Sequence, residues 1–235
     1  MLDMGFEAFT IALLQIIAID IILGGDNAIV IALACRNLPA HQKRAGILWG
    51  TAGAIILRVI LVFFASALMT TPGLRLIGGL LLLWIGVKLI TEETGDDLDG
   101  KIKQNTSLIG AIRTIIIADF VMSLDNALAI TAASKGNMFL VVFGLVLSVP
   151  IIIGGSAIIL RMMERFPVII VLGGSLLGWL GGDLIATDKM VTGYLKDLFS
   201  TVPQIGAIAG AVLVVAIGKL IQIAARRRMA GHDPD

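Results

Sequence analysis

The sequence predicts an all-α, polytopic membrane protein of seven transmembrane helices, in which two inverted three-helix repeats precede a seventh helix. Three observations lead to this fold class. Hydrophobic residues make up 57% of the 235 residues and charged residues only 15%, which is not the composition of a soluble domain of this length. Seven apolar runs are long enough to cross a bilayer. Segments of the first and third runs recur in the fourth and sixth, so the first three runs resemble the next three.

The predicted spans are separated by short polar breaks or by breaks that contain Gly and Pro. Crossing a hydrocarbon core takes roughly 20 apolar residues. Runs that meet this requirement occupy residues 7–35, 45–70, 74–91, 108–134, 138–160, 167–186 and 204–224. The first run carries Asp20 and has no small-residue cleavage site after it. It is therefore expected to be a permanent span rather than a signal peptide.

An acidic motif occurs twice in these apolar surroundings. IDIILGGDNAIVIA, residues 19–32, aligns without gaps with ADFVMSLDNALAIT, residues 118–131. The matched pairs are Asp20 with Asp119, Asp26 with Asp125, and Asn27 with Asn126.

A second pair of segments extends the repeat to the third and sixth spans. IGGLLLLWIGVKLI, residues 77–90, matches LGGSLLGWLGGDLI, residues 172–185. Because each copy contains three spans, an odd number, the second copy enters the membrane from the opposite side. Secondary transporters use such inverted repeats to build a site at the middle of the bilayer.

The excess of Lys and Arg in alternate loops sets the expected orientation, with the N-terminus outside and the C-terminus in the cytoplasm. We expect a single transmembrane domain over residues 1–235. Its parts are repeat A (7–91), a cytoplasmic linker (92–107), repeat B (108–186), an extracytoplasmic loop (187–203), the seventh helix (204–224) and a cytoplasmic tail (225–235).

The repeated carboxylates need a compensating charge. One charged side chain at the centre of a transmembrane helix costs roughly 2.5–3.5 kcal/mol, so four cost on the order of 10 kcal/mol. Arg58, near the middle of the second span, can offset one of them. Since basic partners are too few, a bound cation is the simplest compensation.

The residues around the acids refine this site. Gly24 and Gly25 directly precede Asp26 in the first copy, where they could break the helix and free backbone carbonyls. They could equally form a close-packing surface. Ser123 stands in the second copy and could add a hydroxyl ligand. Carboxylate and amide oxygens suit Mn²⁺, Mg²⁺ or Ca²⁺ rather than Zn²⁺ or Cu⁺.

Several function classes are excluded. The formal net charge of +1 does not favour binding to nucleic acid. The single cysteine, Cys35, rules out an intramolecular disulfide and a cysteine-built metal site. No catalytic triad, zinc motif or phosphate-binding loop is present, so we expect neither an enzyme nor a prosthetic group. The glycine-rich spans permit a homodimer as readily as close packing within the chain.

The motifs GGDNAIVIALA and DFVMSLDNALAITAAS on seven spans resemble the TerC family, its compact YjbE-like branch above all, within the LysE-type transporter superfamily. The resemblance implies export of a divalent metal ion, notably Mn²⁺, across the cytoplasmic membrane. It also implies which residues handle the metal: Asp20, Asp26, Asn27, Asp119, Asp125 and Asn126.

Two alternative functions stay open beside metal export by alternating access. One is a partner in the assembly or metallation of membrane proteins. The other is export of a small cationic or zwitterionic solute, which the low aromatic content of 6% disfavours.

Overall fold

The computed structural model describes residues 6–91, 107–134, 137–192 and 204–230, and the side chain of Asp125 lies outside the described part. All regular structure in these ranges is helical, which confirms the all-α prediction. Each predicted span coincides with one helix, except that the first is divided into α1 and α2. The helices are α1 (Phe6–Leu23), α2 (Gly25–Cys35), α3 (Ala40–Thr70), α4 (Leu74–Thr91), α5 (Leu108–Ser134), α6 (Met138–Arg165), α7 (Val168–Thr187) and α9 (Ile205–Ala230).

Five of the described helices, α3, α4, α6, α7 and α9, are long and apolar enough to cross a membrane. Helices α1 and α2 meet the same requirement together, as one span bent by 47°. Helix α5 has 27 residues, which is enough length for a further crossing. The described part thus contains five or six spans by length and composition, and the count of seven stays a prediction.

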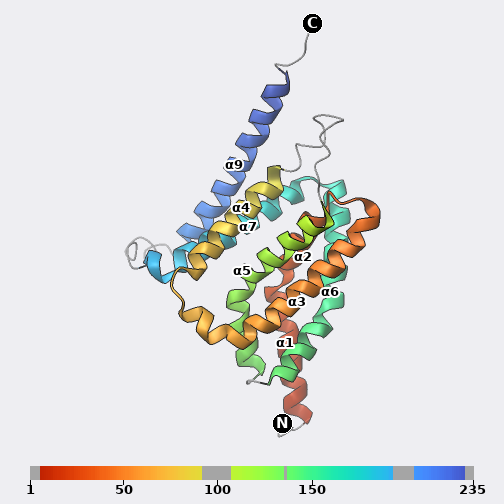
Figure 1. Ribbon diagram of the computed structural model, residues 1–235, viewed down its shortest axis with the longest axis vertical. Helices are drawn as coiled ribbons and strands as arrows, with labels where there is room; N and C mark the ends of the chain where they lie inside the picture. Colours follow the sequence, from red (N-terminus) through yellow and green to blue (C-terminus); the bar gives the residue numbers. More distant parts are fainter. Residues whose placement is uncertain (1–5, 92–106, 135–136, 193–203, 231–235) are drawn as a thin grey trace. The chain divides into compact units, whose positions relative to one another are not determined.

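The helices form two compact units, which we describe separately. Unit 1 contains α1, α2, α3, α5 and most of α6. Helix α3 runs beside α5 (Figure 1), and glycines on α3 make their close approach feasible. A Cβ atom at Gly50 would collide with the side chain of Ile115, and one at Gly53 would lie 2.6 Å from Ile116 Cδ1.

Unit 2 contains α4, α7 and α9. Glycines of α4 and α7 meet reciprocally: a Cβ atom at Gly79 would collide with the carbonyl oxygen of Gly181, and one at Gly181 would lie 2.8 Å from that of Gly79. Gly86 and Gly174 also face each other, less tightly: a Cβ atom at Gly86 would lie 3.1 Å from the carbonyl oxygen of Gly174, and one at Gly174 would lie 3.4 Å from that of Gly86. Such contact between glycines lets two helix backbones approach closely without a polar bond between side chains.

Asp188 joins the end of α7 to the beginning of α4 within unit 2. The side chain is only 2% exposed. Its Oδ1 accepts hydrogen bonds from the backbone N–H groups of Gly73 (3.2 Å) and Met190 (2.8 Å), and its Oδ2 accepts one from Leu76 (3.1 Å). The first N–H groups of a helix have no partner within the helix, so Asp188 supplies a carboxylate cap for α4.

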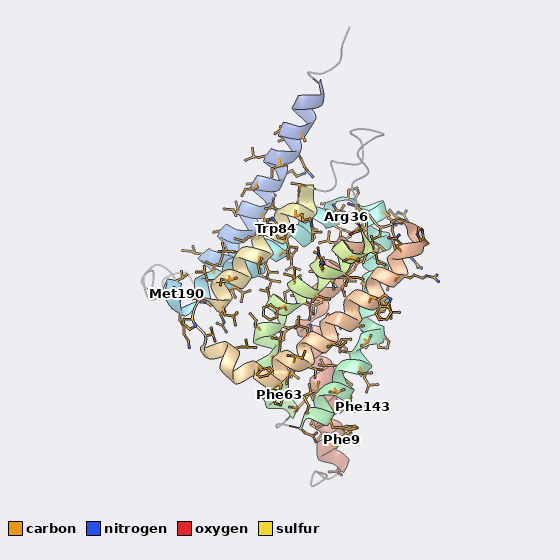
Figure 2. All side chains as sticks on the ribbon, in the orientation of Figure 1. Phe9, Arg36, Phe63, Trp84, Phe143 and Met190 are labelled. Atoms are coloured by element: carbon orange, nitrogen blue, oxygen red, sulfur yellow. The ribbon has the colours of Figure 1, made fainter. Side chains whose placement is uncertain are left out.

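Large apolar side chains project outward from both units. Phe63 of α3 and Phe143 of α6 are 71% and 41% exposed in unit 1, and Trp84 of α4 is 58% exposed in unit 2; Figure 2 labels all three. Aqueous surroundings would oppose this exposure, whereas lipid tails are as apolar as the side chains themselves. The outward faces therefore suit a bilayer.

Candidate functional site

Arg58 lies at the centre of a buried polar cluster in unit 1. Its side chain is 3% exposed, and its guanidinium group contacts residues of two other helices. Nη1 donates to Oδ1 of Asp20 on α1, and Nη2 donates to Oδ1 of Asp119 on α5 at 2.5 Å. The two carboxylates are 2% and 5% exposed. One guanidinium thus joins the first acid of each motif copy.

Two serines add hydrogen bonds to this cluster. Ser123 Oγ accepts a hydrogen bond from Arg58 Nε at 2.8 Å and donates to Asp119 Oδ2 at 3.1 Å. Ser148 of α6 donates to Asp20 Oδ2. Ser123 thus contacts an acid and the arginine of the cluster, and its role as a hydroxyl ligand stays a prediction. The sequence prediction of the site did not include Ser148; its signal was a serine inside an apolar helix, two residues before Pro150.

The helix carrying the first motif is broken at Gly24. Helix α1 ends at Leu23 and α2 begins at Gly25, with an angle of 47° between them. A Cβ atom at Gly24 would collide with the backbone carbonyl oxygen of Asp20, whereas one at Gly25 would meet nothing within 4 Å. Of the two alternatives for the glycine pair, the structure has the helix break, and only Gly24 is sterically required for it.

Because of this break, Asp20 belongs to α1 and Asn27 to α2. Asp26 stands in the first turn of α2, where the helix dipole favours a negative charge. Asn27 is 4% exposed. In the part of the chain that the structure describes, Asp26 Oδ1 and both polar side-chain atoms of Asn27 have no hydrogen-bond partner.

Unsatisfied polar atoms in a buried position are costly, by about 1–3 kcal/mol each. The unpartnered oxygens of Asp26 and Asn27 lie in the first turn after the break at Gly24, whose Cβ position is close to both the backbone carbonyl of Asp20 and the side-chain amide of Asn27. Both oxygens are hard donors of the kind that Mn²⁺, Mg²⁺ and Ca²⁺ prefer.

The remaining predicted ligands are in α5. Asn126 is buried, at 8% exposure, and the position of the Asp125 side chain is outside the described part. Among described side chains, no three of the His, Cys, Asp and Glu type lie close enough together to hold a metal ion. The structure therefore brings Asp20 and Asp119 together through Arg58, and convergence of all four acids stays a prediction.

Comparison with known proteins places the chain in a family. The profile described as "Integral membrane protein TerC family" matches residues 6–229. The chain is 45% identical over 190 residues to the uncharacterized membrane protein YjbE of Bacillus subtilis, covering 80% of this chain and 85% of that one. It is 27% identical over 190 residues to the inner membrane protein YgdQ of Escherichia coli, covering 74% and 80%.

No solved structure matches the chain. The family profile nevertheless spans almost its whole length. The presence of helices that could cross a bilayer agrees with the description of both relatives as membrane proteins. The chain belongs to the TerC family of integral membrane proteins.

Proposed function

We propose that the protein exports a divalent metal ion, Mn²⁺ foremost, from the cytoplasm by alternating access. The observation that carries this proposal is that, within the described part of the chain, Asp26 Oδ1 and the side-chain amide of Asn27 have no hydrogen-bond partner at a break in an apolar helix. Broken transmembrane helices are tolerated where they line a cavity, and transporters use them to bind ions.

The proposed architecture is seven spans in two inverted repeats, with the N-terminus outside and the C-terminus in the cytoplasm. The packing of α4 against α7 supports the repeat. In the sequence alignment Gly79 corresponds to Gly174, and Gly86 to Gly181. A twofold operation therefore turns the Gly79–Gly181 contact into the Gly174–Gly86 contact, and both contacts occur. Reciprocal contact of this kind is characteristic of twofold-related surfaces.

The division into units also supports the repeat. Unit 1 takes the first two helical spans of each repeat, and unit 2 takes the third span of each together with α9. Corresponding parts of the two halves thus belong to the same compact unit. The proposed metal-handling residues, from Asp20 to Asn126, all belong to unit 1.

A role in the assembly or metallation of other membrane proteins is the second candidate. The observation in its favour is that Arg58 already neutralises part of the charge of Asp20 and Asp119. A cluster held together by such ion pairs could be purely structural. In that case, replacing Asp26 by Asn would leave function intact, and a partner protein would co-purify with the chain.

Metal retention in cells separates the two candidates. Cells that lack their own manganese exporter would be loaded with Mn²⁺, washed, and followed for intracellular manganese while they produce wild type, Asp26→Asn or Glu7→Gln. Glu7 is an exposed acid in the first turn of α1 and serves as the matched control. Cells that produce wild type or Glu7→Gln should lose manganese quickly, and cells that produce Asp26→Asn should lose it slowly. Equal loss in all three would contradict metal export through this site.

A further inference from the structure

Arg58 fills the position between the two carboxylates that correspond across the motif copies. Three of its nitrogen atoms are engaged: Nη1 with Asp20, Nη2 with Asp119 and Nε with Ser123. Charge-assisted hydrogen bonds of this kind are roughly twice as strong as neutral ones. The guanidinium is therefore held as a bound cation would be.

Each carboxylate uses both of its oxygens in this arrangement. One oxygen of each faces Arg58, and the other accepts a hydrogen bond from a serine, Ser148 for Asp20 and Ser123 for Asp119. A metal ion that binds between the two acids has to take the place of the guanidinium, which bonds to one oxygen of each. Asp26 and Asn27 present no such obstacle, since the atoms they offer are unpartnered in the described part.

We infer that Arg58 is a resident cation which a divalent metal ion displaces from Asp20 and Asp119, and that this competition excludes monovalent cations. The inference rests on the proposed function, because it assigns a selectivity device to the same site. One guanidinium and two carboxylates leave a formal charge of −1 in the cluster. A divalent ion in place of the guanidinium leaves the two carboxylates neutralised.

Charge decides which ions can compete. Coulomb attraction is proportional to the product of the charges, so a divalent ion gains about twice as much from the same carboxylates as a monovalent ion does. Na⁺ or K⁺ brings only the single charge that Arg58 already supplies, and it brings no hydrogen bonds. Arg58 therefore sets a threshold that divalent ions exceed and monovalent ions do not.

Equilibrium binding of Mn²⁺ to the purified full chain in detergent tests the inference, with free Mn²⁺ followed by its paramagnetic resonance signal. Arg58→Gln removes the competing charge and should bind Mn²⁺ at least about tenfold more tightly than wild type. Arg58→Lys keeps the charge but loses the three-point hydrogen bonding, so it should bind about threefold more tightly. Arg113→Gln replaces an exposed arginine of α5 and should bind as wild type does.

Competition with Na⁺ supplies the second measurement. Excess Na⁺ should weaken Mn²⁺ binding to Arg58→Gln far more than binding to wild type. Because a purely structural arginine would only weaken binding when replaced, tighter binding is specific to competition. If Arg58→Gln does not fold, Arg58→Lys still has to bind more tightly than wild type.

The outcomes distinguish the inference from the proposed function. If wild type binds Mn²⁺ and neither folded Arg58 variant binds it more tightly, the role of Arg58 is overturned and metal export still stands. Absence of Mn²⁺ binding in wild type and in every folded variant would overturn metal export and this inference together.

Discussion

Arg58 of α3 and Asp119 of α5 form a buried ion pair, with 2.5 Å between Nη2 and Oδ1. The same guanidinium also binds Asp20 of α1. Three helices of unit 1 are thus joined by one side chain. Removing one partner of a buried ion pair typically costs about 3–5 kcal/mol, because the other charge stays buried without compensation.

Arg58→Ala should therefore lower the stability of the metal-free protein strongly, by about 3–5 kcal/mol. Two buried carboxylates would lose their cation, and Mn²⁺ should restore part of the loss. Thermal unfolding in detergent, with a chelator and with Mn²⁺, measures both effects. Arg113→Ala, at an exposed position of α5, is the control. A small shift with chelator, similar to that of the control, would contradict the compensating role of Arg58.

Gly24→Ala and Gly25→Ala form a matched pair at the helix break. The new Cβ atom would collide with the carbonyl oxygen of Asp20 in the first variant and would meet nothing within 4 Å in the second. Manganese efflux should fall at least about tenfold for Gly24→Ala and stay within about twofold of wild type for Gly25→Ala. Similar efflux from both variants would show that the break does not shape the site.

Gly181→Ala should destabilise unit 2. Its Cβ atom would lie 2.8 Å from the carbonyl oxygen of Gly79, which is backbone and cannot rotate away. Overpacking of this kind costs about 1–3 kcal/mol. Gly154→Ala on α6, where a Cβ atom meets nothing within 4 Å, is the control. The thermal midpoint of Gly154→Ala should equal or exceed that of wild type, while the midpoint of Gly181→Ala should fall.

Asp188 should make stability depend on pH. Burial raises the pKa of its carboxyl, but backbone N–H donors, those of Met190, Leu76 and Gly73 among them, lower it more, so that the pKa lies below its usual value. A carboxyl whose pKa is lower in the folded state stabilises the protein above the unfolded pKa of about 3.9. That contribution is lost as pH falls through the folded pKa.

Asp188→Asn should accordingly be less stable than wild type at neutral pH, and the difference should shrink below about pH 3.9. Thermal unfolding of both proteins over a pH series measures this difference. Asp183→Asn, near the same end of α7, controls for loss of an acid in this region. A difference that is independent of pH would mean that the carboxylate charge does not stabilise the α4 cap.

Much of the fold could be predicted from the sequence, because length and apolarity are properties of single segments. The helix break at Gly24 was also open to prediction, since two glycines directly precede an acid inside an apolar run. Which of the two glycines matters could not be predicted. That depends on the distance from each Cβ position to the carbonyl of Asp20, which only the folded backbone determines.

The partners of the acids were harder to predict than the acids themselves. The repeat pointed to Asp20 and Asp119, but Arg58 and Ser148 are single residues of helices that carry no comparable motif. Their contacts depend on how α3 and α6 are rotated about their own axes. That Arg58 serves two carboxylates rather than one follows from such rotation and has no signature in the sequence.

The most direct test of metal export is ion flux into or out of proteoliposomes that contain the purified protein. Wild type, Asp26→Asn, Asp125→Asn and Glu7→Gln would be compared with Mn²⁺, Mg²⁺, Ca²⁺ and Zn²⁺. Wild type and Glu7→Gln should move Mn²⁺, and the rate of Mn²⁺ movement should be at least about tenfold lower in both motif variants. Folded wild type that moves none of the four ions, or motif variants that move Mn²⁺ as fast as wild type, would contradict metal transport through the repeated acids.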